Sequence, residues 1–181
     1  MRYNQIRECD IANGEGIGVA LFVQGCPSPH CKNCFNPDTW DFNGGKEWTQ
    51  KTEDKLIELA NRPYIKRLSI LGGEPLADEN LDGVLHLVNR FCLLFSNKSI
   101  WIYSGYTWNQ VMNPVITDDF NPIRDELLHK RKEIVKKCNI LVDGKYIDSQ
   151  RNPLKKWAGS DNQRVISIPE SLKQGKVITI D

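Results

Sequence analysis

Short apolar segments alternate with segments of helical periodicity along this chain, and this alternation limits the folds that it can adopt. Strands are predicted at residues 18–23, 67–71, 100–103 and 139–142. Helices are predicted at residues 49–61, 80–95, 108–112 and 123–137. Because each predicted strand leads through a loop into a helix, we expect an α/β fold with a mainly parallel sheet and flanking helices. The sheet would be either open or part of a barrel.

The remainder of the chain adds little to this plan. A last strand is predicted at residues 164–168 and a short tail strand at residues 177–180. Residues 113–122 are rich in turn-forming residue types and are expected to form an exposed insertion. A length of 181 residues suits one hydrophobic core, so residues 1–181 are expected to form a single domain.

Charge and hydropathy exclude some classes of function. Lys and Arg number 24 against 23 for Asp and Glu, so the formal net charge of +1 gives no reason to expect binding to nucleic acid or to an anionic membrane. No apolar stretch is long enough to span a membrane, and the polar residues 1–5 do not resemble a signal peptide. We therefore expect a cytoplasmic protein.

Three of the six cysteines, Cys26, Cys31 and Cys34, lie in one loop directly after the first predicted strand. Disulfides consume cysteines in pairs, and a structural zinc site normally has four ligands. Three clustered thiolates therefore indicate a metal centre with one position left open. Thiolates suit iron-sulfur clusters, in which a cubane held by three cysteines leaves one iron without a protein ligand.

A structural zinc site remains an alternative, with its fourth ligand supplied by His30, Cys9 or Cys138. The cysteines outside the loop are expected to stay reduced. Cys92 and Cys138 lie in apolar sequence surroundings, so we expect both to be buried.

A second loop of interest, Gly72-Gly73-Glu74-Pro75, follows the second predicted strand. A Gly-Gly pair alone indicates only a tight turn. Because glycine has no Cβ, it also lets a ligand approach the backbone. Loops that follow parallel strands share one edge of the sheet, where ligands bind in such folds. We therefore expect a small-molecule site where this loop meets the cysteine loop, Ser104-Gly105 and residues 143–145.

These motifs resemble those of the radical S-adenosylmethionine superfamily. Residues 13–16, 34–40, 104–107 and 154–165 more closely resemble the family of proteins that activate anaerobic ribonucleoside-triphosphate reductase. The resemblance implies a partial (βα) barrel of the radical S-adenosylmethionine type. The chain departs from the family in having four residues between Cys26 and Cys31, where three are usual. Pro27 and Pro29 stiffen this segment, and we expect it to bulge outward.

The resemblance also implies a set of site residues. Cys26, Cys31 and Cys34 would bind three irons of a 4Fe-4S cluster, and S-adenosyl-L-methionine would chelate the fourth. No catalytic residue is implied beyond these cluster ligands. The implied cofactor contacts are Gly72 and Gly73 at the methionine ammonium, the backbone of Asn33, Cys34 and Phe35 near the adenine, and Asp143 and Lys145 at the ribose hydroxyls and the carboxylate. Arg164, by its residue type alone, is expected to be available for an anion.

The activity implied by the resemblance is glycyl-radical activation. A low-potential electron donor such as flavodoxin or ferredoxin would reduce the cluster, and S-adenosylmethionine would be cleaved to methionine and a 5′-deoxyadenosyl radical. That radical would remove a hydrogen from a backbone glycine of anaerobic ribonucleoside-triphosphate reductase. One alternative is a radical enzyme that acts on a small molecule, as carboxydeazaguanine synthases do. Another is a non-catalytic iron-sulfur or zinc module, for which the Gly-Gly-Glu-Pro loop would have no explained purpose.

Overall fold

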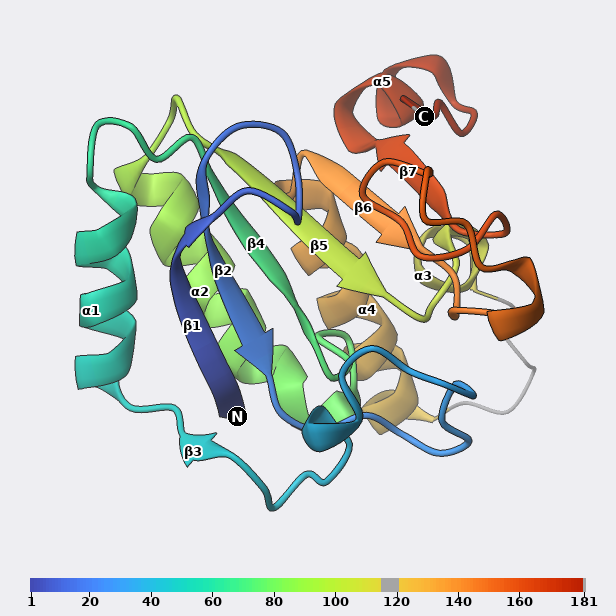
Figure 1. Ribbon diagram of the computed structural model, residues 1–181, viewed down its shortest axis with the longest axis horizontal. Helices are drawn as coiled ribbons and strands as arrows, with labels where there is room; N and C mark the ends of the chain where they lie inside the picture. Colours follow the sequence, from blue (N-terminus) through green and yellow to red (C-terminus); the bar gives the residue numbers. More distant parts are fainter. Residues whose placement is uncertain (115–120, 181) are drawn as a thin grey trace.

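Seven strands form one mixed sheet in the computed structural model, which describes residues 1–114 and 121–180 (Figure 1). The strands are β1 (Arg2–Asp10), β2 (Gly18–Val23), β3 (Lys46–Glu47), β4 (Arg67–Gly72), β5 (Ser99–Ser104), β6 (Ile140–Asp143) and β7 (Arg164–Ser167). The α-helices are α1 (Gln50–Ala60), α2 (Leu81–Leu94), α3 (Trp108–Met112), α4 (Pro122–Lys137) and α5 (Ile168–Gln174). The short 3₁₀ helices are η1 (Pro37–Thr39), η2 (Asp78–Asn80) and η3 (Asp148–Gln150).

The centre of the sheet is parallel, as predicted. The strand order is β3-β1-β2-β4-β5-β6-β7, with β2, β4, β5 and β6 parallel to one another. The outer strands reverse direction: β1 is antiparallel to β2, and β7 is antiparallel to β6. The sheet begins at β3 and ends at β7 without closing, so the α/β prediction is confirmed and a closed barrel is not observed.

Helix α1 illustrates how the sequence sets the limits of an element. Thr49 is its N-cap, and the side chain of Thr49 accepts a hydrogen bond from the Thr52 backbone N–H at 3.2 Å. This bond satisfies one of the backbone donors that the first turn leaves without a partner. The apolar residues Leu56, Leu59 and Ala60 are buried against the sheet. The predicted helices at α1, α2, α3 and α4 are all observed.

The ends of the chain differ from the prediction. Strand β1 and helix α5 were not predicted, and the strand predicted at 164–168 ends at Ser167, where α5 follows directly. The predicted tail strand forms only an isolated bridge between Ile166 and Thr179. Of the insertion predicted at 113–122, residues 115–120 lie outside the described residues.

The two faces of the sheet have different environments. One face packs against α1, α2 and α4 in the main hydrophobic core, and α2 and α4 lie behind the sheet in Figure 1. The opposite face carries two small apolar clusters, one around Phe22 and the other around Trp101. The fully buried Arg67 forms an ion pair with Asp10 at 2.8 Å. No helix covers this second face in the part of the chain that the structure describes.

All six cysteines are free thiols. Cys138 is 3% exposed, as predicted. Cys92 is exposed, and the prediction that it is buried was wrong because the buried stripe of α2 runs through Val84, Leu87, Val88 and Phe91 and leaves position 92 on its solvent side. Within residues 1–114 and 121–180, the helices are too short or too polar to cross a membrane.

Candidate functional site

The three clustered cysteines line one cavity of about 890 Å³ at the carboxyl ends of the parallel strands. Other loops at this edge contribute Gly72 and Gly73 after β4, Ser104 and Gly105 after β5, and Lys145 after β6. The predicted meeting of these loops is therefore observed. Phe35 also lines the cavity, whereas Asn33 and Asp143 do not.

The cysteine loop is held at its base and leaves its tip exposed. Gly25 N–H donates to Thr39 O at 2.8 Å, and Cys26 N–H donates to Trp40 O at 3.0 Å. His30 stacks on Trp40 with ring centroids 4.2 Å apart, and its Nε2 lies 3.0 Å from Cys26 O. Residues 27–30, the segment expected to bulge outward, are exposed, while all three cysteines line the cavity.

Gly72 and Gly73 are required by the protein's own packing. A Cβ on Gly73 would lie 2.2 Å from Gly25 O, and Gly72 has φ +107° in the left-handed region. Gly73 N–H donates to Val23 O at 3.0 Å, and Glu74 N–H donates to Gly25 O at 2.7 Å. The turn after β4 is therefore docked against the start of the cysteine loop. The missing Cβ atoms leave room for neighbouring backbone and side chains, whatever ligand the cavity holds.

Glu74 carries the only carboxylate among the described residues that line the cavity. Its carboxylate accepts hydrogen bonds from Leu76 N–H at 2.9 Å, Ser104 Oγ at 2.8 Å and Gly105 N–H at 2.7 Å. Burial raises the pKa of Glu74, although these three donors and the charge of Arg131 oppose that shift. Glu74 therefore joins the ends of β4 and β5, a role that the Gly-Gly-Glu-Pro pattern alone did not reveal.

Two thiols of the cysteine loop, those of Cys26 and Cys31, have raised pKa values. Burial, together with the charges of Glu74 and the other two thiols of the loop, raises the pKa of Cys26 to about 11, while Lys145 opposes the rise. Burial also raises the pKa of Cys31. Because a metal binds the thiolate, loading this site would release protons to solvent.

The donor set fits an iron-sulfur cluster better than a zinc ion. Among the residues that the structure describes, no three His, Cys, Asp or Glu side chains converge closely enough to hold a single metal ion. Cys9, Cys138 and His30, the fourth ligands considered for zinc, do not line the cavity. In a cubane, each cysteine binds a different iron, so the three sulfurs need not meet at one point.

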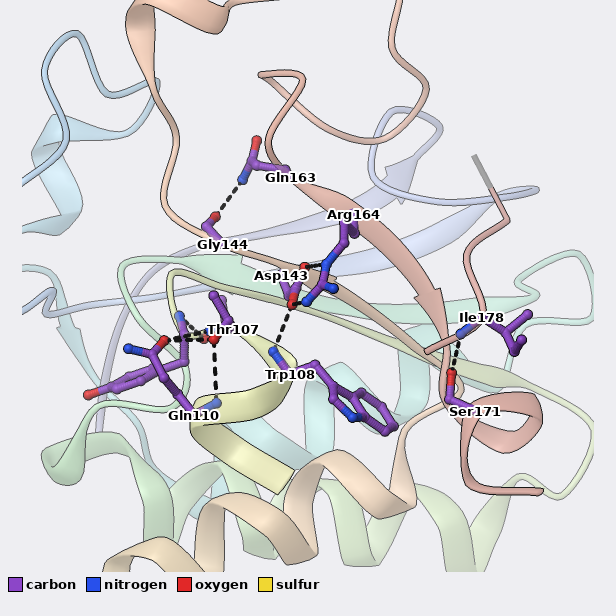
Figure 2. Close-up of polar contacts among 11 residues, drawn as sticks. Thr107, Trp108, Gln110, Asp143, Gly144, Gln163, Arg164, Ser171 and Ile178 are labelled. Atoms are coloured by element: carbon purple, nitrogen blue, oxygen red, sulfur yellow. Dashed lines mark hydrogen bonds and ion pairs between the residues drawn. The ribbon is translucent and has the colours of Figure 1, made fainter. Parts of the chain in front are cut away.

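Asp143 and Lys145 have separate positions. Asp143 is 1% exposed, and its carboxylate accepts hydrogen bonds from Arg164 Nε at 3.0 Å and from Trp108 N–H at 2.7 Å (Figure 2). Among the described residues, Arg164 thus binds the carboxylate of Asp143, which lies opposite it in the β6–β7 pair. Lys145 lies at the cavity, where its Nζ donates to Pro29 O at 3.0 Å and ties the end of β6 to the cysteine loop.

Asn33 and Phe35 flank Cys34. Asn33 has φ 55°, and its Nδ2 donates to Asp148 Oδ2 at 2.9 Å, which connects the cysteine loop to the segment after β6. Phe35 is 58% exposed, and its ring centroid lies 4.9 Å from that of Tyr146. These contacts give the loop a second anchor, in the segment after β6.

Several lining residues were not predicted. The cavity continues onto the helix-free face of the sheet, where Arg7, Asn13, Phe22, Tyr103 and Trp157 line it. Arg7 belongs to β1, a strand that was not predicted. Trp157 lies in the 154–165 segment, which had no chemical motif to interpret. The structure now shows that this segment forms one wall of the cavity.

Comparison with known proteins agrees with this geometry. A protein family described as a 4Fe-4S single cluster domain matches residues 12–166. Proteins named anaerobic ribonucleoside-triphosphate reductase-activating protein are similar along most of the chain. The protein from Salmonella typhi is 36% identical over 167 residues, which are 91% of this chain and 97% of that protein. The one from Escherichia coli (strain K12) has the same identity and coverage, and the one from Enterobacteria phage T4 is 34% identical over 168 residues, 92% of this chain and 94% of that protein.

Proposed function

The chain belongs to the family of anaerobic ribonucleoside-triphosphate reductase-activating proteins, and on this premise we propose that it generates a glycyl radical in such a reductase. The observation that carries the proposal is the cavity in which three cysteines of one loop meet the turn after β4. A metal centre with three protein ligands keeps one position for a substrate or cosubstrate. A purely structural module would have no need of the adjoining cavity.

The cluster ligands would be Cys26, Cys31 and Cys34, with S-adenosyl-L-methionine on the iron that no cysteine binds. When bound, the cluster would supply the electron for reductive cleavage of S-adenosylmethionine, and the cofactor would supply the organic radical that takes a hydrogen atom from the target glycine. The residues of the chain hold the reactants and exclude water. The target hydrogen must be held close to the radical carbon, within about 3–3.5 Å for the heavy atoms, which requires the reductase segment to enter the cavity.

The proposed cofactor contacts differ in how directly the cavity supports them. Gly72, Gly73, Phe35 and Lys145 line it, so the methionine ammonium, the adenine and the carboxylate would each have a residue nearby. Asp143 would act indirectly. Its carboxylate already binds Arg164 and the start of α3, so it would hold these two parts of the chain in place beside the cofactor. Asn33 would contribute only its backbone beside Cys34.

We also propose that residues 1–181 form one catalytic domain and that the open sheet corresponds to the partial (βα) barrel of the superfamily. Helices on one face and the cavity on the other support this correspondence. A low-potential donor such as flavodoxin or ferredoxin would reduce the cluster. Six free thiols suit the reducing conditions of the cytoplasm, the location that we propose.

A cysteine substitution with a matched control tests the proposal. Cys31→Ala should lower the iron content of the anaerobically reconstituted protein and abolish the release of 5′-deoxyadenosine. Cys9→Ala, which alters an exposed thiol outside the cavity, should leave both unchanged. Full 5′-deoxyadenosine release by Cys31→Ala would exclude the assigned cluster. Cofactor cleavage without a glycyl radical in a competent reductase would favour a small-molecule substrate.

A further inference from the structure

The hydroxyl group of Tyr103 is buried and has no hydrogen-bond partner among the described residues, although its side chain lines the cavity. Leaving a buried hydroxyl unpaired costs free energy, so native structures rarely do so. The ring packs against the Phe22 cluster on one side and the Trp101 cluster on the other. An apolar setting of this kind offers the hydroxyl no partner of its own and suggests that a ligand supplies one.

The ring of Tyr103 faces the part of the cavity that lies on the helix-free face of the sheet. Tyr103 is the next-to-last residue of β5, and it faces the helix-free side of the sheet. The charges of Arg67 and Asp10 both act on its hydroxyl, and Arg67 is the first residue of β4. The unpaired hydroxyl therefore belongs to the face of the sheet that the helices leave open, next to Ser104 and Gly105 at the end of β5.

The chemistry of the cavity favours a ligand with acceptor oxygens. Four cationic residues line it, Arg7, Lys145, Arg151 and Lys155, against the single carboxylate of Glu74, which already accepts three hydrogen bonds. Burial raises the pKa of Tyr103, so its hydroxyl remains a neutral donor. A neutral donor among apolar side chains matches a peptide carbonyl, because neither partner brings a charge into the apolar surroundings.

The cavity is large for a small-molecule site. At about 890 Å³, it lies near the upper end of the range of about 300–1,000 Å³ for small-molecule sites. Arg7 adds a second donor at the rim, where its guanidinium lies 4.4 Å above the ring of Phe22. A short extended segment of a partner protein could therefore pass over Phe22 and place a peptide group at Tyr103.

We propose that the Tyr103 hydroxyl donates a hydrogen bond to a backbone carbonyl of the reductase segment that carries the target glycine. This assignment rests on the proposed function and adds to it a binding residue for the protein substrate. The segment would cross the helix-free face of the sheet between the loop after β1 and the 154–165 wall. Tyr103 would fix how far the segment enters and so which residue faces the cofactor.

Tyr103→Phe tests the assignment, because it removes only the hydroxyl. The probe is the intact glycyl-radical subunit of the reductase, titrated against the reconstituted variant. We expect the reductase concentration at half-maximal glycyl-radical formation to rise at least about fivefold, since a buried carbonyl would lose its donor. Release of 5′-deoxyadenosine without reductase, and its dependence on S-adenosylmethionine concentration, should match the wild type. The melting temperature should not fall, because no intramolecular hydrogen bond is lost.

Tyr64→Phe is the matched control, since Tyr64 is 47% exposed and lies outside the cavity. It should behave as the wild type in every assay. A Tyr103→Phe variant with an unchanged reductase requirement would overturn the assignment. So would a raised requirement for S-adenosylmethionine alone, which would place the hydroxyl at the cofactor. A wild-type chain that cleaves the cofactor and never forms a glycyl radical would instead overturn the proposed function.

Discussion

Gly73→Ala should disturb the cysteine loop without touching a cysteine. The added Cβ would lie 2.2 Å from Gly25 O and 3.0 Å from Thr39 O, so backbone on one side must move by more than an ångström. That movement would strain or break the bonds from Gly73 N–H to Val23 O and from Glu74 N–H to Gly25 O. Two hydrogen bonds at about 0.5–1.5 kcal/mol each, with about 1–3 kcal/mol of overpacking, give a loss of about 2–6 kcal/mol in unfolding free energy.

Urea unfolding of the metal-free protein measures this loss, and iron per chain after reconstitution measures its effect on the site. Iron loading should fall because Gly25 directly precedes Cys26. Gly175→Ala is the control: Gly175 has φ +67° with nothing within 4 Å of a built Cβ, so it carries only the conformational cost of about 1 kcal/mol. If Gly73→Ala were no less stable than Gly175→Ala and loaded iron fully, the contact of the turn after β4 with the cysteine loop would support neither the fold nor the metal site.

Two further substitutions test the buried charges. Because burial raises the folded-state pKa of Glu74 above its unfolded value of about 4.3, its contribution to stability is greatest below that value and is lost as the pH rises through the folded pKa. In urea unfolding over a pH series, the unfolding free energy of Glu74→Gln should lack this decline with rising pH. A decline identical to that of the wild type would contradict the raised pKa of Glu74. Arg67→Ala should cost about 3–5 kcal/mol in the same assay because it leaves the buried Asp10 unpaired, whereas Lys55→Ala, which breaks an exposed pair, should cost about 1 kcal/mol or less.

The central strands and helices were predictable from their apolar residues. These form short continuous runs in the strands and recur at helical spacing in the helices. Strand β2 is buried at every residue, and Thr49 marks the start of α1 by its capping chemistry. Strand β1 was missed because it is polar and only partly buried, with Arg7, Glu8 and Cys9 exposed. Its pairing with β2, and not its composition, makes it a strand. The apolar pattern of a strand also carries no information on its direction, so the reversal of the outer strands was not predicted.

The site was predictable where single loops carry it and unpredictable where strand pairing builds it. The three cysteines and the Gly-Gly-Glu-Pro turn are local, and parallel strands bring their loops to one edge. The ion pair of Asp143 with Arg164 depends on the register of β6 with β7, which the sequence does not reveal. The unpaired hydroxyl of Tyr103 depends on three strands at once. That the protein's own backbone packing also requires Gly72 and Gly73 could not be read from the local pattern, because it depends on how the turn after β4 meets the cysteine loop.

The transfer of a hydrogen atom from the reductase to the cofactor is the central claim, and an isotope experiment measures it directly. The reductase would be prepared with α-deuterated glycine and mixed anaerobically with the reconstituted, reduced protein and unlabelled S-adenosylmethionine. The account predicts a glycyl radical by electron paramagnetic resonance, together with one deuterium in the 5′-deoxyadenosine detected by mass spectrometry. Release of 5′-deoxyadenosine that carries no deuterium, with no radical on a competent reductase, would contradict the account.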